Sequence, residues 1–449
     1  MRGSSRSRRQ WLLRALGASL FAVAALGGEP APAAAPAEVV PNSDCLECHA
    51  DPDLTTTNAD GRVRSLFVDA RLLAASCHAR NTCVSCHTTV TAQHPDDGTG
   101  PGPVDCGGCH AEASESHARS AHGRVWRGGD AAAARCADCH GVHGILPSSD
   151  PASSIHHDNL VGTCRQCHAG ATPKFALGRI HLDAAASGDL GTAVNRWVRR
   201  FYLFLIVLTG TLLLVHNGLF WLRCAQTARR DRGPSVLRMN LNHRLQHAAL
   251  ALSFVVLAAS GFALKFPDSW IAWCFGADEL ICRWSHRFAA FVLVGVCGYH
   301  LLHVAFAREG RQLLRDLRPR RRDLADLRHN IRYALGREPR RARFPRFGYI
   351  EKFEYWAVVW GTIIMGVTGL MIWFPVEVTR LLPRWAIDVA ATIHYYEAIL
   401  ACLAILLWHF YHVILDPEVY PLNRAFLDGR VPLEYHESHH DESDEGGPR

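Results

Sequence analysis

The pentapeptide C-x-x-C-H occurs five times between positions 45 and 168 of this 449-residue chain. A histidine placed directly after each cysteine pair would recur this often by chance on the order of one time in a million. The five copies are Cys45–His49, Cys83–His87, Cys106–His110, Cys136–His140 and Cys164–His168. This segment must therefore fold around whatever its cysteines and histidines hold.

The spacing within each motif fits a covalently attached haem. Two thiols three residues apart reach the two vinyl groups of one porphyrin, and the next side chain then lies under the iron as the proximal ligand. Structural zinc takes four ligands from two separated pairs, and a disulfide does not need the histidine. We therefore expect five c-type haems. They would be attached through Cys45, Cys48, Cys83, Cys86, Cys106, Cys109, Cys136, Cys139, Cys164 and Cys167, with proximal ligands His49, His87, His110, His140 and His168. With about 30 residues per haem, the porphyrins form the core, and short helices at the motifs alternate with coil.

Further histidines in this segment are available as second axial ligands. Eight candidates for five irons suffice for bis-histidine ligation throughout, with three left as surface residues. The segment resembles the small periplasmic multihaem cytochromes, including the quinol-dehydrogenase and tetrahaem groups, in which an S-x-H-G-like element supplies the distal ligand. That resemblance favours "SCHA" at 76–79 and "SAHG" at 120–123. The distal candidates are His78, His122, His143, His156 and His181, with His94, His117 and His157 as alternates.

Cys77 lies beside His78 but outside the five motifs. We interpret it as a spare thiol next to a ligand histidine. The alternative is a sixth haem attached through a single thioether.

Five apolar stretches follow, each long enough to cross a bilayer. They run at about 200–222, 245–265, 286–307, 354–376 and 388–414. The loops 223–244 and 307–350 hold six and fourteen Lys plus Arg, whereas 265–285 and 375–393 hold two each. Arginine-rich loops stay in the cytoplasm. We therefore expect a protein of the bacterial inner membrane with the haem segment in the periplasm and the C-terminus in the cytoplasm. The net charge of +6 then reflects membrane topology and does not indicate a nucleic-acid partner.

The N-terminus, "MRGSSRSRRQWLLRALGASLFAVAALGG", combines a basic start with a short apolar stretch. This is typical of a secretory signal, and an uncleaved anchor helix is the alternative. The predicted domains are a signal peptide at 1–36, a pentahaem domain at 41–190, a membrane domain at 198–422 and an acidic, disordered tail at 423–449. The expected fold class is an all-α bundle of five transmembrane helices behind a coil-rich periplasmic pentahaem cytochrome c domain.

Histidines within membrane spans are expensive and usually functional. The predicted spans and their ends carry His216, His247, His286, His300, His303, His394, His409 and His412. His286 and His300 lie about 21 Å apart along one predicted helix and nearly on one face, whereas His394 and His409 lie about 22 Å apart and about 60° off. Two histidines per helix at opposite depths are what two stacked b-type haems need.

Residues 240–422 resemble the membrane cytochrome b subunits of formate dehydrogenase and nickel–iron hydrogenase. The resemblance rests on segments such as "SHRFAAFVLVGVCGYHLLHV" and "IHYYEAILACLAILLWHFYHVILDPEVYP". That family binds two b haems, with a quinone near the cytoplasmic one. The resemblance implies that His286 and His394 hold the periplasmic haem and that His247 and His409 hold the cytoplasmic haem. The alternates are His300 and His303 for His247, and His412 for His409.

The leading predicted helix, which carries His216, lies outside that four-helix pattern. Glu397 lies one helical turn from His394, where its carboxyl either orients a ligand or neighbouring helix through a hydrogen bond or exchanges protons with a quinone or haem propionate. Glu397, His216 and His303 are our candidates for quinone and proton chemistry. Cys274 and Cys282 share a periplasmic loop, where a disulfide and two free thiols are both open.

These patterns together predict one electron path between a quinone pool and the periplasm. In the preferred hypothesis menaquinol is oxidised in the membrane, and its electrons pass through two b haems and five c haems to a soluble cytochrome or terminal reductase. The chain would then be a quinol:cytochrome c-type oxidoreductase or its electron-transfer subunit. It resembles the fused c- and b-type cytochromes of metal-respiring and other anaerobic bacteria (the CbcL-like class). Two alternatives stay open: a membrane anchor that passes electrons from a periplasmic dehydrogenase to quinone, and a terminal reductase with one open c haem.

Overall fold

The computed structural model describes residues 40–57, 61–98, 100–127, 132–177, 181, 190–224 and 234–433. The predicted signal peptide and the chain from residue 434 onward lie outside these ranges. The chain divides into two compact units. The first contains the residues up to Ala74 together with His78–Asp105, and the second contains Ala75–Cys77 and the residues from Cys106 onward. Two of the five motifs therefore belong to the first unit and three to the second, whereas the sequence predicted a single domain over 41–190.

The first unit consists of short elements joined by coil. They are α2 (Asn42–His49), β1 (Thr55–Thr57), β2 (Val63–Ser65), α3 (Ala70–Ala75), which ends at the boundary, and α4 (Cys83–Cys86). β1 and β2 form an antiparallel ribbon with Thr56 opposite Arg64. None of the three helices contains a buried residue. So short a chain has too little apolar surface to build a core by itself.

The beginning of the second unit also consists of short elements joined by coil. Each remaining motif lies in or next to a short helical turn. The elements are η1 (Cys106–Gly108), α5 (Ala111–Arg119), α6 (Ala121–Arg127), α7 (Cys136–His140), α8 (Leu160–Arg165) and α9 (Pro173–Ala176). Side-chain hydroxyls tie the intervening coil together. Ser154 Oγ donates to the Cys139 carbonyl, and Thr163 Oγ1 donates to the Ser154 carbonyl at 2.6 Å.

Five helices of the described chain are long and apolar enough to cross a membrane, as predicted. They are α10 (Leu190–Cys224), α11 (Leu241–Lys265), α13 (Glu279–Phe306), α16 (Tyr349–Trp373) and α18 (Trp385–Ala404), which continues through two π-helical turns, η2 (Ile405–His409) and η3 (Tyr411–Leu415). The helix α10 begins ten residues before the predicted apolar stretch at 200. Helix-forming residues such as Leu, Ala and Arg extend it beyond the apolar segment.

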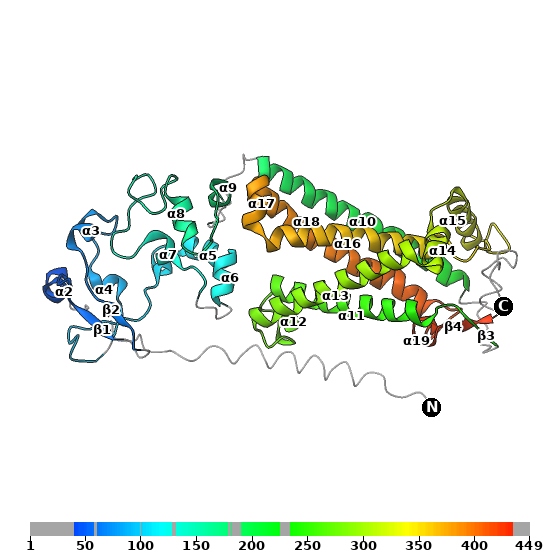
Figure 1. Ribbon diagram of the computed structural model, residues 1–449, viewed down its shortest axis with the longest axis horizontal. Coiled ribbons are helices and arrows are strands. Elements are labelled where there is room, and N and C mark those ends of the chain that lie inside the picture. The colour runs from blue at the N-terminus through cyan, green and yellow to red at the C-terminus, as the bar shows by residue number, and fades with distance from the viewer. Residues whose placement is uncertain are drawn as a thin grey trace, which may run out of the picture. The chain divides into compact units, whose positions relative to one another are not determined.

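The long helices form two groups, which Figure 1 shows. The helix α11 packs along α13, and α18 packs against both α10 and α16. Many large apolar side chains on these helices are exposed, among them Phe204, Leu252 and Phe288. Exposed apolar surface of this extent marks a face that meets another apolar phase. With the length and composition of the helices, this describes an integral membrane domain.

Short helices cover the connections at the two ends of the bundle. The α11–α13 connection contains α12 (Trp270–Trp273), and the α16–α18 connection contains α17 (Pro375–Leu381). The arginine-rich connection contains α14 (Arg308–Leu317) and α15 (Arg321–Ala334). A buried ion pair, Lys352 Nζ to Asp323 Oδ1 at 2.6 Å, joins α15 to α16. The basic loop is therefore folded onto the end of the bundle.

The chain after the last long helix is ordered further than the sequence predicted. We expected disorder from residue 423, but α19 (Ala425–Asp428) and β4 (Arg430–Pro432) follow. The strand β4 pairs antiparallel with β3 (Ser235–Leu237), and Val236 lies opposite the buried Val431. Gly429 makes the turn before β4 with φ +82°, a conformation that glycine adopts without strain. This pairing of distant segments is invisible in local composition.

Cys274 and Cys282 are free thiols in this structure. The sulfur of Cys282 is buried with Ala263 and Ala272 in a small apolar cluster, whereas Cys274 is exposed. The sequence left open a disulfide or two free thiols, and the structure has two free thiols.

Candidate functional site

A pair of histidines faces one another between α13 and α18. The ring centroids of His286 and His394 are 6.3 Å apart. Two imidazoles on opposite sides of one metal ion, each with a metal–nitrogen bond of about 2 Å, have ring centres roughly 6.4 Å apart. The two rings are thus spaced to bind one metal ion between them.

Each of these rings is held from behind by a hydroxyl of the preceding long helix. The Ser260 hydroxyl of α11 lies 3.0 Å from Nδ1 of His286, and the Thr368 hydroxyl of α16 lies 3.0 Å from Nδ1 of His394. Both pairs are separated by 26 residues in sequence. Because Nδ1 is engaged, Nε2 is the nitrogen left for a metal, as is usual for ligating histidines.

A glycine follows each of these hydroxyl residues. A Cβ at Gly261 would lie 3.2 Å from Cε1 of His286, and a Cβ at Gly369 would lie 3.3 Å from Cε1 of His394. The absence of a side chain lets each helix approach the edge of the ring. The glycines therefore allow the hydroxyl contacts to form.

We expect that Gly369→Val displaces the His394 ring and reduces haem affinity at this pair by about 10–100-fold, the cost of disturbing contacts around a ligand. The readout is the ratio of non-covalent haem to protein in purified membranes. Gly366→Ala on the same helix is the matched control, because nothing lies within 4 Å of a Cβ there. Full haem content in both variants would contradict the packing argument.

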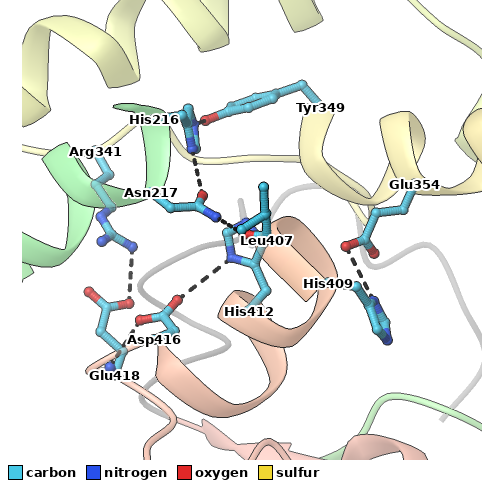
Figure 2. Close-up of polar contacts among 10 residues, drawn as sticks. All are labelled: His216, Asn217, Arg341, Tyr349, Glu354, Leu407, His409, His412, Asp416 and Glu418. Carbon is cyan, nitrogen blue, oxygen red and sulfur yellow. Dashed lines mark hydrogen bonds and ion pairs between the residues drawn. The ribbon is translucent and has the colours of Figure 1, made fainter. Parts of the chain in front are cut away.

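A second pair lies toward the other end of the same helices. The ring centroids of His247 on α11 and His409 in η2 are 6.0 Å apart, again the spacing of two trans ligands. The Glu354 carboxylate of α16 lies 3.3 Å from Nδ1 of His409, which again leaves Nε2 for a metal (Figure 2). Fifteen residues of helix separate His394 from His409, a rise of about 22 Å. The two pairs thus lie at different depths.

The structure separates these residues from the predicted alternates. Both ring nitrogens of His300 have partners, with Nδ1 2.9 Å from Gln246 Oε1 and Nε2 3.1 Å from the Tyr355 hydroxyl. Nδ1 of His412 is 3.9 Å from an oxygen of Asp416. The ring of His303 faces His243, with centroids 5.8 Å apart, and therefore does not stand in for His247 opposite His409. The geometry therefore favours His247 and His409 as the second pair.

The three candidates for quinone and proton chemistry belong to separate contacts. Glu397 is 4 % exposed, and its carboxyl is hydrogen-bonded to the Tyr202 hydroxyl of α10. Nε2 of His216 is 3.0 Å from the Tyr349 hydroxyl, as Figure 2 shows. Nε2 of His303 is buried, with no hydrogen-bond partner among the described residues. The structure does not gather the three into one site.

Among the described residues, a second histidine ring lies opposite the C-x-x-C-H histidines His49, His140 and His168. The centroid distances are 6.5 Å for His49–His94, 5.9 Å for His122–His168 and 6.1 Å for His140–His181. All three are close to the separation of trans imidazole ligands. The rings of the first pair are within 10° of parallel.

Local contacts orient these rings and favour their neutral form. Nδ1 of His49 is 2.8 Å from the Leu66 carbonyl, which fixes the ring and leaves Nε2 for a metal. Burial, and then the neighbouring His168, lower the pKa of His122. Burial, and then His181 and His110, lower the pKa of His140. A neutral imidazole is the form that binds a metal.

The distal partners differ in part from the preferred candidates. His122 and His181 lie opposite motif histidines as expected, but the ring opposite His49 belongs to His94, a residue treated as an alternate. The buried ring of His156 lies against His157 at 4.1 Å, so these two contact each other. Nε2 of His117 lies 3.1 Å from the Ala134 carbonyl. These pairings depend on chain folding between motifs, which no local sequence element encodes.

Neighbouring motifs lie close together within each unit. In the first unit the Cys83 thiol is hydrogen-bonded to the Cys45 side chain, and burial raises the pKa of Cys83 to about 11. In the second, burial and then the nearby Cys164 raise the pKa of Cys139. A cavity of about 530 Å³ borders Cys109, His110 and His181, a volume in the range of cofactor pockets. Groups attached at these motifs would therefore lie near one another.

The last motif also contacts the membrane bundle. The helix α9, five residues beyond His168, packs against α17, and Lys174 Nζ donates to the Leu381 carbonyl at 3.4 Å. A Cβ at Gly170 would meet the Arg380 guanidinium at 3.2 Å, and Ala171 is fully buried. The fifth motif is thus held against the α16–α18 connection, at the end of the bundle where His394 lies.

The residues behind the ligands were missed by the sequence analysis. Ser260, Thr368 and Glu354 were not singled out, although Ser260-Gly261 and Thr368-Gly369 each precede a predicted ligand by the same interval. Aligning the sequence of α11 and α13 with that of α16 and α18 would have revealed them. Gly261 and Gly369 would also have appeared at equivalent positions in that alignment.

Comparison with known proteins bears on the membrane part. Residues 238–426 match the family described as prokaryotic cytochrome b561. The membrane part is a b-type cytochrome. This cytochrome is also similar to the cytochrome b556(Fdn) subunit of the nitrate-inducible formate dehydrogenase of Escherichia coli K12, with 22 % identity over 211 residues, 47 % of this chain and 90 % of the relative. The corresponding proteins of Escherichia coli O157:H7 and Shigella flexneri match equally well. The matched family segment starts after α10, so that helix and the C-x-x-C-H segment lie outside the match.

Proposed function

We propose that this protein carries electrons from menaquinol in the membrane to redox partners in the periplasm, through two b haems and five c haems. The observation that carries the proposal is the presence of two trans-spaced histidine pairs, His247–His409 and His286–His394, at two depths of one b-type cytochrome bundle. Two haems at these depths would bridge most of a hydrocarbon layer about 30 Å thick.

Haem supplies an iron that takes up and releases one electron at a time. The chain's own residues then determine where each haem lies and how it is oriented. Ser260 and Thr368 hold the two rings of the periplasmic pair, and Glu354 holds His409 in the cytoplasmic pair. Contacts of this kind raise the basicity of a ligand and fix its orientation. The donors present therefore suit two six-coordinate haems.

The proposed route continues from the periplasmic b haem to the haem at the fifth motif. Its support is the contact of α9 with α17 and the pairing of His168 with His122. From there the haems at the fourth and third motifs extend the path, and the first two motifs end it in the other unit. His78 and His143 are the proposed distal ligands for the two haems whose partners are not given above.

Menaquinol oxidation releases two electrons and two protons per molecule. We place this reaction near the cytoplasmic haem, held by His247 and His409, and the resemblance to formate dehydrogenase cytochromes supports that choice. The matched relative is a subunit of a formate dehydrogenase. The reverse direction, in which a periplasmic dehydrogenase feeds electrons toward quinone, is tested by the experiment below.

We expect purified protein to contain five covalent and two non-covalent haems per chain, counted as pyridine haemochromes. Addition of menaquinol under anaerobic conditions should reduce the b haems first and the c haems afterwards, followed by optical spectroscopy. Fewer than two protohaems, or b haems that menaquinol leaves oxidised, would contradict the proposed function. The spectra should be low-spin throughout, and a high-spin c haem would instead favour a terminal reductase.

A further inference from the structure

The two halves of the b-type cytochrome repeat one another, with one exception. Ser260 precedes His286 by the interval that separates Thr368 from His394. Toward the cytoplasmic end, Gln246 lies against His300 with a separation of 54 residues, whereas Glu354 lies against His409 with a separation of 55. The second half therefore contains one extra residue before its cytoplasmic histidine.

The π-helical turn η2 accommodates that extra residue. The Phe410 N–H bonds to the Ile405 carbonyl, five residues back, instead of four as in an α-helix. Such a turn holds one residue more than an α-helical turn. A regular helix would rotate His409 about 60° away from the face of His394. The wider turn returns His409 toward that face, where Glu354 and His247 meet it.

A π turn leaves a backbone carbonyl without its helical donor, because the bonding register changes from i−4 to i−5. In η2 the Leu407 carbonyl accepts a hydrogen bond from a side chain of α10, because Asn217 Nδ2 donates to it, as Figure 2 shows. Asn217 is 5 % exposed, so water does not compete for this bond.

The amide of Asn217 is itself held in orientation. Nδ1 of His216 lies 3.1 Å from Asn217 Oδ1, and Nε2 of His216 lies 3.0 Å from the Tyr349 hydroxyl. Because a carbonyl oxygen only accepts, His216 donates from Nδ1 and receives the Tyr349 proton at Nε2. The amide nitrogen of Asn217 then points at η2. The His216 ring also packs on Trp408, the neighbour of His409, at 4.7 Å.

We propose that Asn217, on a helix outside the matched cytochrome segment, is a positioning residue for the cytoplasmic haem ligand His409, because it stabilises the π turn that sets the rotation of that histidine. The inference rests on the proposed function, since it takes His409 to be a haem ligand. His216 and Tyr349 support it by orienting the amide. The helix α10 would then do two things: it would connect the c-type and b-type parts, and it would help to position a haem ligand within the membrane.

The test uses the full-length protein in membranes and compares Asn217→Leu with Gly218→Ala. Leucine keeps the side-chain volume but removes the donor, and a Cβ at Gly218 has nothing within 4 Å. We expect Asn217→Leu to lower occupancy of the cytoplasmic haem, or to shift its EPR signal, with about a tenfold loss in haem affinity. The periplasmic haem should be unchanged. Gly218→Ala should match the wild type in both haems.

A deletion provides the second arm. Removal of Leu406, which is 54 % exposed, takes out the extra residue and gives His409 the fourteen-residue spacing of His286 and His300 in a regular helix. We expect this deletion variant to keep both b haems. When Asn217→Leu is combined with the deletion, the occupancy of the cytoplasmic haem should not fall further. Such a cycle isolates the coupling between the amide and the turn.

Two outcomes would overturn the inference. One is an Asn217→Leu protein whose b haems both resemble those of Gly218→Ala. The other is equal damage to both b haems, because a purely structural role would affect the bundle as a whole. A wild-type protein without a second b haem would instead remove the proposed function itself, so the two failures are distinguishable.

Discussion

Replacing His394 by alanine should remove one of the two b haems and disconnect menaquinol from the c haems. The ring of His394 lies 6.3 Å from that of His286, and no other ring contact of His286 is found among the described residues. Disturbing a contact around a ligand costs about 10–100-fold in affinity, so loss of the ligand itself should cost at least about 100-fold. Stopped-flow mixing with menaquinol would show the cytoplasmic haem reduced and the c haems still oxidised.

His300→Ala is the matched control for this variant. His300 lies in the same domain, but both of its nitrogens contact other side chains, Gln246 and Tyr355. The control should keep two b haems and reduce its c haems at the wild-type rate to within a few-fold. Rapid c haem reduction in His394→Ala would refute the route through the periplasmic pair.

Removing the fifth c haem should have the second-largest effect. In the double variant Cys164→Ser and Cys167→Ser the haem count should fall from seven to six. In the proposed route the lost haem is the one that joins the bundle to the other c haems, because α9, just beyond this motif, packs on α17. Menaquinol should then reduce both b haems and leave the four remaining c haems oxidised over the time in which the wild type reduces all of its haems.

The corresponding change at the first motif, Cys45→Ser and Cys48→Ser, should behave differently. That motif belongs to the other compact unit. Its loss should leave reduction of the remaining c haems by menaquinol intact and slow only transfer to an external acceptor. If the two double variants gave the same kinetics with menaquinol, the fifth haem would not be the junction.

The membrane part was largely predictable because its physical constraints are local. A span needs a continuous apolar run, so all five long helices were located to within about ten residues. The histidine pairs followed from their spacing along two helices and from the resemblance. Hydroxyl and carboxyl partners were not predicted, because Ser260, Thr368 and Glu354 lie on different helices from the rings they contact.

The C-x-x-C-H segment was predictable only at the level of its motifs. A proximal histidine is fixed by the adjacent cysteines, but a distal one is chosen by tertiary folding. His94 is a case in point, since 45 residues of chain separate it from His49 while the two rings are 6.5 Å apart. The π turn η2 was equally hidden. Nothing in "ILLWH" departs from an ordinary apolar helix, and the signal was the 60° mismatch between His394 and His409.

The pairing of β3 with β4 has a consequence for how such a protein is assembled from parts. It joins the segment just before α11 to the segment just after α19, so the four-helix cytochrome begins and ends at one place. A module whose ends lie close together at its surface can be joined to other sequence without disturbing its core. The C-x-x-C-H segment and α10 precede the module at this place. Through Asn217, α10 also bonds to the last long helix of the module, so the module and the segment before it would have to fold together for the His409 turn to form.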